Sequence, residues 1–582
     1  MFALFEDRQA PAEATSAWLF ENPVRFLAPC DREGLIAALN EVAADNAWWV
    51  AAFDYELGYL LEPASAPAGR RPEPGKPLAR LWGFKDCRRL RAEEVDDWLE
   101  GQMESIPEDE RIAGIGGIES GQAPSAYRQA VDRIQDYIAA GDCYQVNYTF
   151  PLHFRWFGHP LALYRALRSR QPVRYGGLVA TEGGGIVSLS PELFLEKQGN
   201  RLATRPMKGT APRSSDPAAL QASEKNRAEN LMIVDLLRND LGRVAESGSV
   251  QVDSLFEIEA YPTLWQMVSQ VSARVPGRSL ADILAALFPC GSITGAPKIR
   301  AMQIAGELEG QPRRLYTGAL GWIAPDGDFR LNVSIRTLEL DADGRGRLGI
   351  GSGIVTDSDP ESEWQECLLK SAFLTDLDPG LKLIETLRRE DGRYPRLGGH
   401  LARLRRSAAW FGFPFDEAAV RQALSASPEQ GTWRVRLTLD KAGAVEVTAA
   451  ALGPEPAVPR FAAIARDSID SRDPLRGHKT TVRSAYDAAL KSIAARPEIF
   501  DTIFLNERGE VAEGARSNVF VERDGVLLTP PLASGALPGV LRAELLTAGR
   551  AREAVLTPAD LAEDFLLGNA LRGFIPVRLL AD

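Results

Sequence analysis

The feature that most constrains this chain is a polar interruption, LTDLDPGLK at residues 374–382, which contains a Pro-Gly turn. Before it, short helical and strand-like patterns alternate to about residue 375. After it the pattern restarts with a strand, a turn at Asp391-Gly392 and a helix. The 582 residues suffice for several hydrophobic cores, since a domain takes roughly 100–200 residues. We therefore expect two domains, residues 1–377 and 378–582.

Local patterns predict several elements of the first domain. Residues 48–61 are strand-like, residues 62–78 form a surface loop rich in Pro, Ala and Gly, and residues 101–126 are irregular. A helix is predicted to begin at Pro124 and to stop at Gly141. The alternating residues 144–154 (YQVNYTFPLHF) then predict a strand.

Composition excludes several classes of function. The net charge is −12 and the pI is about 5.2, so a nucleic-acid partner is not expected. The five cysteines form no CxxC, which argues against a disulfide framework or a zinc site. The N-terminus carries charges where a signal peptide needs an apolar core, and no run approaches the ~20 apolar residues of a spanning helix. We expect a cytoplasmic protein without a membrane partner.

A lysine and a glutamate in residues 188–213 are the first candidates for chemistry. Glu192 follows a Ser-Pro turn, and Lys208 lies 16 residues later beside Gly209, where the backbone can turn tightly. An amine is a nucleophile only when it is neutral, so burial or a nearby cation would have to lower its pKa. On this segment alone, an exposed surface lysine is the more common outcome.

Three further glutamates suggest a metal site. Glu229 lies in a predicted helix over residues 223–244. Glu363 and Glu366 are three residues apart in a helix that starts at Asp359-Pro360, so both carboxylates share one face. Magnesium binds through one or two carboxylates together with water and substrate oxygens. The alternative is an acidic, solvated helix face.

Two glycine-containing segments suggest close approach of another group. The run Gly-Ser-Ile-Thr-Gly-Ala-Pro-Lys, which ends at Lys298, offers backbone N–H groups just before a predicted helix, an arrangement that suits an anion. Gly349, Gly351 and Gly353 line a predicted strand on which another group can approach the backbone. Taken singly, such a turn is weak evidence.

Together and in this order, these segments resemble the chorismate-utilising enzymes: anthranilate synthase, aminodeoxychorismate synthase component I, isochorismate synthase and salicylate synthase. The resemblance covers most of residues 45–375 and implies an α/β fold, a two-sheet sandwich with helices outside. It implies that Glu229 and Glu366 bind Mg²⁺ with Glu363 close by, and that Glu192 protonates the leaving C4 hydroxyl. The implied substrate-binding groups are Arg336, Tyr316, Lys298 and the backbone of Gly351, Ser352 and Gly353.

Lys208 distinguishes between branches of this family. Anthranilate synthases resemble this segment but carry Ala at that position, whereas aminodeoxychorismate synthases carry Lys, as in the PMKGT of this chain. The resemblance implies that Lys208 adds to C2 of chorismate before ammonia adds at C4. Phe288, in place of a His common in anthranilate and isochorismate enzymes, points the same way. Because no glutaminase motif is found, we expect ammonia from a separate glutamine amidotransferase subunit.

The second domain carries HLARL (400–404), HKTT (478–481), GEVAEGARSNVFV (509–521) and LPGVLR (537–542). This combination resembles the fold-type IV pyridoxal-phosphate enzymes, such as branched-chain aminotransferases and 4-amino-4-deoxychorismate lyase, and implies an α+β domain that binds pyridoxal 5'-phosphate. The resemblance assigns Lys479 as the Schiff-base lysine and Glu513 as the partner of the pyridinium nitrogen. It assigns phosphate binding to Arg403 and to the backbone of Gly539, Val540 and Leu541.

Lyases and aminotransferases of this family share the same set of cofactor-binding residues. Since the substrate of the lyase is the product expected of the first domain, we expect a multifunctional transferase and lyase that makes 4-aminobenzoate, the folate precursor, by eliminating pyruvate. Two alternatives stay open: the same synthase fused to an aminotransferase, and an anthranilate synthase-like first domain. The residues HKTTVRSAYD differ from the KxLN pattern common in stand-alone members. A homodimer through the second domain is a further hypothesis.

Overall fold

The structure, a computed structural model, describes residues 1–67, 75–261, 264–453 and 460–580. Its internal contacts divide the chain into two compact units, which we describe one at a time. Unit 1 comprises residues 1–105, 119–154 and 163–377, and unit 2 comprises residues 106–118, 155–162 and 378–582. Within the described ranges, no helix combines the length and apolar character that crossing a bilayer requires.

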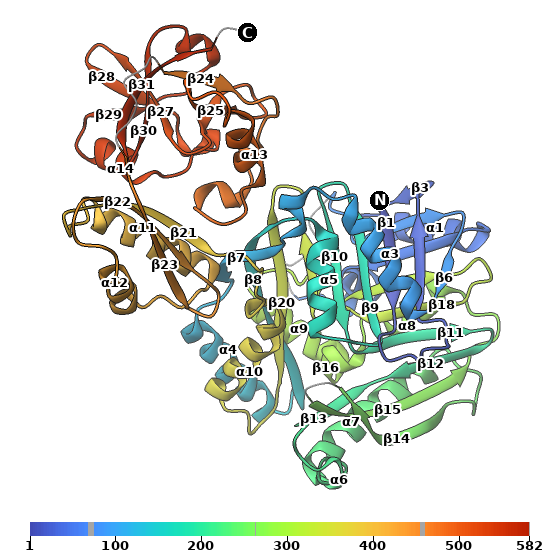
Figure 1. Cartoon of the computed structure of the whole chain (residues 1–582). Coiled ribbons are helices and arrows are strands. Elements are labelled where there is room, and N and C mark those ends of the chain that lie inside the picture. Colours follow the sequence, from blue (N-terminus) through green and yellow to red (C-terminus); the bar gives the residue numbers. More distant parts are fainter. Residues whose placement is uncertain (68–74, 262–263, 454–459, 581–582) are drawn as a thin grey trace. The chain divides into compact units, whose positions relative to one another are not determined.

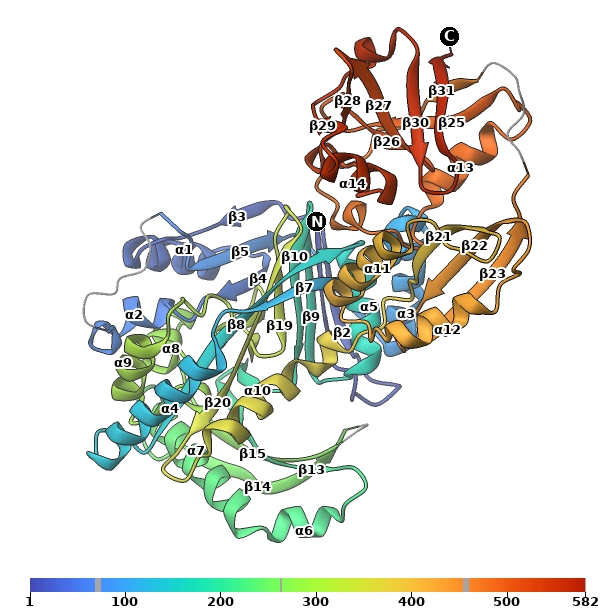
Figure 2. The same cartoon turned by 90° about the vertical axis from the view of Figure 1, so that its left-hand side faces the viewer.

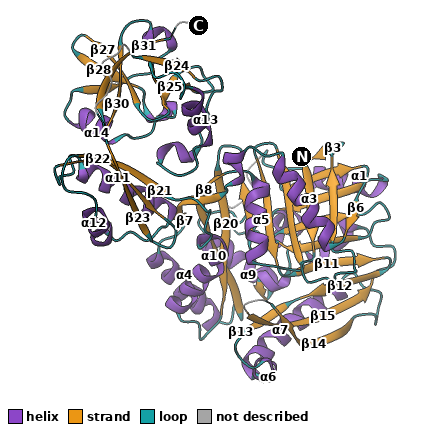
Figure 3. Cartoon of the chain, viewed as in Figure 1, coloured by secondary structure: helices purple, strands orange, loops and turns teal. Residues whose placement is uncertain are grey.

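Unit 1 is built on two large sheets, whose strands are orange in Figure 3. Neighbours such as β1 and β9, or β9 and β10, run antiparallel. The first sheet has the order β16 (Gly295–Ala296), β8 (Gln145–Phe157), β20 (Arg345–Ile354), β19 (Thr337–Leu340), β10 (Gly184–Ser190), β9 (Tyr175–Thr181), β1 (Phe2–Glu6), β2 (Ala17–Glu21) and β6 (Arg88–Leu90), with β7 (Gly114–Ser120) beside β8. The second has the order β13 (Met207–Pro212), β15 (Leu264–Arg274), β12 (Arg201–Arg205), β11 (Leu193–Gln198), β18 (Phe329–Val333), β17 (Ala319–Ile323), β4 (Trp48–Phe53), β5 (Ala79–Phe84) and β3 (Arg25–Leu27), with β14 (Gln251–Ala260) beside β15.

Several helices of unit 1 begin at a residue that caps them. Asp31, Ser223 and Asp359 each accept a hydrogen bond from a backbone N–H group of the first turn of α1, α7 and α10. The helices are α1 (Arg32–Ala44), α2 (Leu57–Leu61), α3 (Ala92–Glu104), α4 (Pro124–Ala139), α5 (Pro160–Arg170), α6 (Pro217–Ala222), α7 (Glu224–Gly242), α8 (Leu280–Leu287), α9 (Lys298–Leu308) and α10 (Pro360–Thr375).

Strand β4 shows how the two sheets face each other. Side chains alternate across a strand, so Trp49, Ala51 and Phe53 point to one face and Val50 and Ala52 to the other. The first set belongs to a core cluster shared with α1, α7 and α8. The second set belongs to a cluster shared with β1, β9 and β10 of the other sheet. The sheets therefore form a sandwich, with helices on the outer face of the second sheet.

Helices α4 and α10 lie side by side against β20 (Figures 1 and 2). An aromatic cluster holds them there, in which Phe150 of β8 stacks on Trp364 of α10 with ring centroids 4.9 Å apart. Tyr127 of α4 meets Phe150 and Trp364 edge-on, at 5.5 and 5.3 Å. Such pairs contribute about 0.5–1.5 kcal/mol each beyond the area that they bury. The cluster thereby fixes the helix that carries Glu363 and Glu366.

A buried ion pair joins α9 to the first sheet. Arg313 Nη2 lies 2.7 Å from Glu309 Oε1, and the two side chains are only 1% and 5% exposed. Glu309 also accepts hydrogen bonds from the backbone N–H and the hydroxyl of Thr149 in β8. Arg313 donates to the carbonyls of Asn147 and Ile293, and Ile293 belongs to the short helix η3 (Gly291–Ile293). One guanidinium group thus holds three elements together.

Unit 2 contains a smaller and a larger sheet. Helices α11 and α12 share an apolar core with the smaller sheet, and in the larger sheet β24 runs parallel to both β25 and β31. The smaller sheet has the order β21 (Leu383–Glu390), β22 (Thr432–Leu439) and β23 (Val445–Ala451), and the larger has the order β26 (Val511–Gly514), β25 (Ile499–Leu505), β24 (Phe461–Ile464), β31 (Gly573–Leu579), β30 (Phe565–Asn569), β27 (Asn518–Arg523), β28 (Val526–Thr529) and β29 (Ala551–Glu553). The helices are α11 (Leu397–Phe411), α12 (Glu417–Ser425), α13 (Ser484–Ser492) and α14 (Val540–Thr547).

Two short segments from early in the chain complete unit 2. At Gly116 a Cβ atom would lie 2.2 Å from the ring of Trp410, so only glycine fits there. The Trp410 ring lies on the ring of His478, with centroids 4.4 Å apart. The Asp109 carboxylate accepts a 3.0 Å hydrogen bond from the backbone N–H of Ser484, at the start of α13. Residues 106–118 therefore brace both ends of the loop that contains Lys479.

Two local predictions are wrong. Strand β4 ends at Phe53, and residues 57–61 form α2, because Leu57, Leu60 and Leu61 recur at helical rather than strand spacing. Residues 101–126 were predicted to be irregular but contain the end of α3, strand β7 and the start of α4. The helix from Pro124 and the strand that follows it are confirmed by α4 and β8. Residues 68–74 of the predicted loop lie outside the described residues.

Replacing Glu309 with Gln should destabilise unit 1 by about 3–5 kcal/mol, because Arg313 would keep a buried charge without a counter-ion. The free energy of unfolding from urea denaturation measures the effect. The matched control is Glu361→Gln, which breaks an exposed pair with Arg128 and should cost about 0–1 kcal/mol. Equal losses in the two variants would contradict the importance given to the buried pair.

Candidate active sites

Glu192 is a buried carboxyl group between β10 and β11, with 5% of its surface exposed. Ser292 of η3 donates a 2.6 Å hydrogen bond to Glu192 Oε1. Burial raises the pKa of Glu192, while the Ser292 hydroxyl and the nearby positive charge of Lys208 act in the opposite direction. A carboxyl group with a raised pKa can carry a proton and donate it. Lys208 thus lies within electrostatic reach of a group suited to act as an acid.

Lys208 is half-buried in β13, directly before Gly209, whose φ of +92° suits glycine. The turn is held from two sides: Gln266 donates to the carbonyl of Gly209 at 2.8 Å, and Asn230 donates to the carbonyl of Lys208 at 3.5 Å. Within the residues that the structure describes, the Lys208 amine makes no hydrogen bond and no ion pair. The backbone at Lys208 is thus held in place while its amine has no described partner, and this arrangement suits a nucleophile.

The two carboxylates of α10 differ in their partners. Glu363 accepts a 2.7 Å hydrogen bond from the hydroxyl of Ser358. Glu366 pairs at 2.7 Å with Lys370, one turn further along α10. Lys370 also donates a 2.9 Å hydrogen bond to the carbonyl of Gly351 in β20. This lysine therefore ties Glu366 to the glycine-containing strand.

Among the described residues, no group of three or more His, Cys, Asp and Glu side chains is arranged to hold a metal ion. Glu229 is half-buried on α7, and among the described residues it forms no hydrogen bond or ion pair with the α10 carboxylates. A magnesium ion needs only one or two protein carboxylates when water and substrate oxygens complete its shell. The hard oxygen donors Glu363 and Glu366, one helical turn apart, therefore fit Mg²⁺.

The predicted substrate-binding residues lie in different surroundings. Arg336 has a left-handed backbone (φ +49°), and burial lowers the pKa of its guanidinium, which has no hydrogen bond or ion pair with any described residue. Tyr316 is buried with its ring against Gly349, where a Cβ atom would lie 2.0 Å from Tyr316 Cγ. The Ser352 hydroxyl bonds to Tyr127 of α4 at 2.8 Å, so only the backbone of Ser352 is available on the glycine face.

Lys298 forms an ion pair and a hydrogen bond within the fold. Its ammonium group lies 2.5 Å from Asp240 Oδ2 and donates a 3.0 Å hydrogen bond to the carbonyl of Leu287. Burial raises the pKa of Asp240, and Lys298 opposes that shift. The pair joins the first residue of α9 to α7.

In unit 2, Lys479 lies against the edge of β21, where its carbonyl accepts a 2.8 Å hydrogen bond from Ile384 N–H. Burial lowers the pKa of Lys479 to about 8, and the nearby cations Arg403 and Arg483 act in the same direction. An amine with this pKa is neutral in a substantial fraction of molecules near neutral pH. It is therefore suited to attack a carbonyl carbon and to accept a proton.

Glu513 of β26 is buried, and both of its oxygens have a donor. The Tyr486 hydroxyl donates to Oε1 at 2.6 Å, and Leu537 N–H donates to Oε2 at 3.0 Å. Arg476 in turn donates to the Tyr486 hydroxyl at 2.8 Å. Burial raises the pKa of Glu513, while Tyr486 and Leu537 lower it. The carboxyl group is thus held in one orientation by a tyrosine that is itself held by an arginine.

Arg403 of α11 is held by another buried carboxylate. Its guanidinium donates to both oxygens of Glu385, at 2.9 and 2.6 Å, and His400 Nδ1 lies 2.6 Å from Glu385 Oε2. Burial alone would raise the pKa of Glu385, but Arg403 and His400 lower it to about 2. Arg403 Nη1 reaches the carbonyl of Pro538 at 3.3 Å. The cation therefore faces the loop before α14.

The loop before α14 has the geometry of a phosphate-binding turn. Gly539 precedes the helix, and no side chain caps its N-terminus. A Cβ atom on Gly539 would lie 1.9 Å from Asn518 Oδ1, while Asn518 donates to the carbonyl of Leu537 at 3.0 Å. The close packing requires glycine, and the free N–H groups of the first helical turn suit an anion. Together with Lys479, Glu513 and Arg403, this donor set fits pyridoxal 5'-phosphate.

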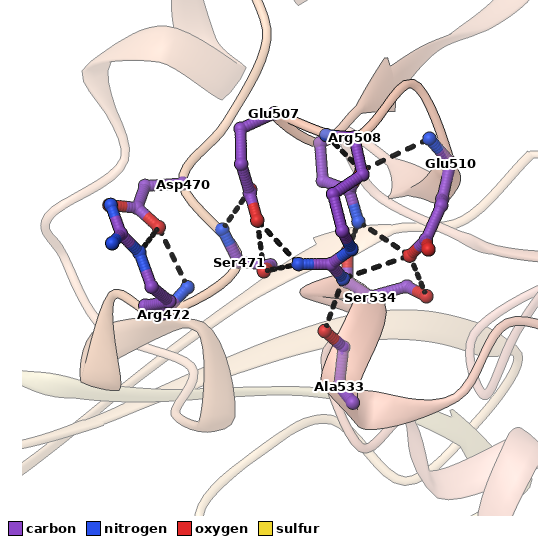
Figure 4. Close-up of polar contacts among 9 residues, drawn as sticks. Asp470, Ser471, Arg472, Glu507, Arg508, Glu510, Ala533 and Ser534 are labelled. Atoms are coloured by element: carbon purple, nitrogen blue, oxygen red, sulfur yellow. Dashed lines mark hydrogen bonds and ion pairs between the residues drawn. The ribbon is translucent and has the colours of Figure 1, made fainter. Parts of the chain in front are cut away.

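A polar network supports the same loop from outside (Figure 4). Arg508 donates to Ser471 Oγ, Glu510 Oε2 and the carbonyl of Ala533, each at 2.9 Å. The Ser534 hydroxyl donates to Glu510 at 2.8 Å. Residues 532–534 are thereby fixed a few residues before the backbone N–H group that binds Glu513.

Residues 8–376 match the family model of the chorismate binding enzymes. The chain belongs to this family. One relative is aminodeoxychorismate synthase component 1 of Escherichia coli K12, which is 41% identical over 277 residues, 46% of this chain and 60% of that protein. Another is anthranilate synthase component 1 of Streptomyces coelicolor, also 41% identical, over 45% of this chain and 53% of that protein. The chain thus spans three fifths or less of the length of these relatives.

The predicted two-sheet α/β fold is confirmed for this chorismate binding enzyme. The crystal structure of anthranilate synthase component I from Streptococcus pneumoniae is 27% identical and covers 61% of this chain and 91% of its own, with a TM-score of 0.53. Residues 382–580 match the class IV amino-transferase model. That match implies pyridoxal 5'-phosphate as a cofactor, and enzymes of the chorismate-binding family typically use Mg²⁺.

The structure adds four residues that the sequence analysis missed: Ser292, Lys370, Glu385 and Tyr486. Lys370 follows Glu366 by four residues in a helix, a spacing that would have predicted the pair. Ser292 lies inside the Gly-Ser-Ile-Thr-Gly turn, of which only the backbone was considered. Glu385 and Tyr486 carry no local signal, because they meet Arg403 and Glu513 only in the folded chain.

Replacing Tyr486 with Phe should destabilise unit 2 by about 1–3 kcal/mol, because one oxygen of the buried Glu513 would lose its donor. The substitution should also raise the pKa of Glu513 further. A raised carboxyl pKa means that the folded state holds the proton more tightly than the unfolded chain, so ionisation of Glu513 destabilises the folded state. The extra loss in the variant should therefore grow as pH rises through the raised pKa of Glu513 in the parent protein.

Urea denaturation at several pH values measures this effect. The control is Tyr394→Phe, which removes a 2.8 Å hydrogen bond to the carbonyl of Leu424 and should cost about 0.5–1.5 kcal/mol at every pH. A pH-independent loss in Tyr486→Phe would refute the link to Glu513.

Proposed function

We propose that the chain makes 4-aminobenzoate in two steps. The first step converts chorismate and ammonia to 4-amino-4-deoxychorismate and water, and the second releases pyruvate from that product. The observation that carries the proposal is that Lys208, whose amine has no hydrogen-bond partner among the described residues, interacts electrostatically with Glu192, whose pKa is raised by burial. The E. coli relative named aminodeoxychorismate synthase component 1 supports it.

In the first step Glu192 and Lys208 have complementary tasks. Lys208 first loses its ammonium proton to solvent. Glu192 then gives its proton to the C4 hydroxyl, which leaves as water while the Lys208 amine bonds to C2 and the ring double bond shifts. Ammonia then bonds to C4, the double bond shifts back and the bond from Lys208 to C2 breaks. Glu192 recovers a proton from the added ammonia. We propose that a separate glutamine amidotransferase supplies this ammonia.

Chorismate is a dianion, and the chain is acidic overall, so local cations must hold it. We assign the two substrate carboxylates to Arg336, whose guanidinium has no described partner, to Tyr316 and to the backbone of Gly351, Ser352 and Gly353. Mg²⁺ held by Glu366, with Glu229 and Glu363, would supply electrophilic help to the departing hydroxyl. The contacts of Lys298 with Asp240 favour a positioning role for Lys298.

The second step is proposed for unit 2. Bound pyridoxal 5'-phosphate supplies an electron sink beside the carbon that bears the amino group. Lys479 accepts the proton from that carbon, the neighbouring carbon–oxygen bond breaks, and the proton is returned to the methylene carbon of the departing enolpyruvate to give pyruvate. Glu513 would pair with the ring nitrogen and keep it protonated, while Arg403 and the backbone of Gly539, Val540 and Leu541 would hold the phosphate.

We further propose domains at residues 1–377 and 378–582, which the ends of the two family matches at 376 and 382 support. A cytoplasmic location and a homodimer through the second domain stay predictions. Two alternatives have specific support: an aminotransferase in unit 2, from the class IV amino-transferase match, and an anthranilate synthase in unit 1, from the Streptomyces coelicolor relative.

The purified chain, given chorismate, Mg²⁺, ammonia and pyridoxal 5'-phosphate, should release 4-aminobenzoate and pyruvate in equal amounts. Lys479→Ala should accumulate 4-amino-4-deoxychorismate. Lys208→Ala should lose both amination and the covalent adduct that mass spectrometry of quenched parent protein detects. Lys225→Ala, a change at an exposed lysine of α7, is the control that should keep both.

Each alternative has its own product in this assay. Accumulation of 4-amino-4-deoxychorismate by the parent chain would favour the aminotransferase, and formation of 2-aminobenzoate would favour the anthranilate synthase. Full amination by Lys208→Ala would refute the proposed nucleophile.

Replacing Ser292 with Ala should shift the alkaline limb of the pH profile of kcat/KM for amination to higher pH. The Ser292 hydroxyl stabilises the ionised form of Glu192, so its removal raises the pKa of Glu192 further and keeps the acid protonated longer. Amination rates measured from pH 5 to 9 give the limb. An unchanged limb, or a shift to lower pH, would mean that Glu192 is not the acid.

A further inference from the structure

A pocket of about 300 Å³ lies in unit 1, between the start of α4 and the loop that follows α9. Its lining includes Gln122, Ala126, Phe150, Gln311, Tyr316 and Arg347. Among the described residues that line it, none is acidic. Its lining includes none of Glu192, Lys208, Arg336 and Glu366 and shares Tyr316 with the proposed site of amination, so it adjoins that site without containing the reacting groups.

Arg347 is a cation of this pocket that forms no direct ion pair with a described residue, although Glu339 lies opposite it in the register of β19 and β20. Arg347 lies on β20 with 9% of its surface exposed, and it donates a hydrogen bond to the carbonyl of Pro312. Its Nε is buried without a hydrogen-bond partner, and it forms no ion pair with any residue of the described ranges. Burying a guanidinium group without an ion pair raises the free energy of the folded state, and an anion that binds to Arg347 offsets part of that increase.

The acids that act electrostatically on Arg347 are Glu339, Glu56 and Asp54, and each has other partners. Asp54 and Glu339 both pair with Arg80. Glu56 accepts hydrogen bonds from the backbone N–H groups of Arg313 and Arg314. These contacts leave the Arg347 guanidinium available to a group that enters the pocket.

A second positive element lies across the pocket. Helix α4 has 16 residues and begins at Pro124 with no side-chain cap. Ala123 and Ala126, which flank its first turn, line the pocket. The uncapped N–H groups of a helix start carry a partial positive charge. The helix start and Arg347 are independent features that favour the same kind of ligand.

The rest of the wall is neutral. The Arg313 guanidinium is saturated by Glu309 and by backbone carbonyls. Gln122 is hydrogen-bonded to Tyr148, and Gln311 is hydrogen-bonded to His153. Phe150, Pro151 and Leu308 supply apolar surface. This combination suits one negative charge attached to an apolar body.

We propose that this pocket binds a small organic monocarboxylate, with its carboxylate near Arg347 and the first turn of α4 and its apolar body against Phe150 and Pro151. The volume suits an aromatic or branched aliphatic acid. Gly349 of the glycine-containing strand lines the pocket, together with Tyr316, whose ring packs against that glycine. The inference does not depend on the proposed function.

Calorimetric titration of the full chain with benzoate tests the proposal. Saturable binding is expected, and the neutral analogue benzamide should bind at least about tenfold more weakly, because it lacks the charge that Arg347 attracts. Arg347→Gln should abolish benzoate binding. Arg345→Gln, at an exposed arginine of the same strand that pairs with Asp343, is the matched control that should retain it.

A second variant guards against misfolding of Arg347→Gln. Ala126→Glu adds a carboxylate at an exposed position on the pocket wall and should weaken benzoate binding at least about tenfold. Gln129→Glu adds the same charge to α4 outside the lining and should leave binding unchanged. Arg336→Gln separates the two sites: binding that survives this change supports the pocket. Absence of benzoate binding, or binding lost in Arg336→Gln and kept in Arg347→Gln and Ala126→Glu, overturns the proposal.

Discussion

The guanidinium of Arg313 is the contact on which much of unit 1 depends. It binds Glu309 and the carbonyls of Asn147 and Ile293, so one buried charge orders the end of α9, strand β8 and the turn η3. Ile293 is the neighbour of Ser292, whose hydroxyl binds Glu192. The position of the proposed acid therefore depends on a charge far along the chain from it. Removing that charge's partner would loosen the sheets and the proposed acid together.

Three buried carboxyl groups show how neighbours decide the outcome of burial. Glu192 has one hydroxyl donor and a nearby lysine, and Glu513 has two donors; burial raises the pKa of both. Glu385 is also buried, yet contacts with Arg403 and His400 lower its pKa to about 2. Glu192 is suited to hold a proton and donate it, whereas Glu385 stays ionised and holds Arg403. All three side chains are buried, so the direct contact of Glu385 with the Arg403 guanidinium makes the difference.

The sequence predicts those parts of the sites that depend on local spacing. The shared face of Glu363 and Glu366, the helix start at Asp359-Pro360 and the turn at Lys208-Gly209 all follow from neighbouring residues. Contacts between distant segments could not be predicted without the fold. The hydroxyl of Ser292 reaches Glu192 across 100 residues, and the wrong strand prediction at residues 57–61 shows that a short apolar run is compatible with either periodicity.

Because residues 106–118 and 155–162 belong to unit 2, one continuous gene segment that starts after them does not encode all of unit 2. A gene cut at codon 378 would remove Asp109 from the start of α13 and would strip Phe157 from the aromatic rings of Trp410 and Phe411. The piece left behind would expose an aromatic surface and an uncapped helix beside Lys479. Once the two reading frames had joined, mutations in these early segments could become necessary to the later enzyme. Reversal of the fusion would then need several compensating substitutions at once.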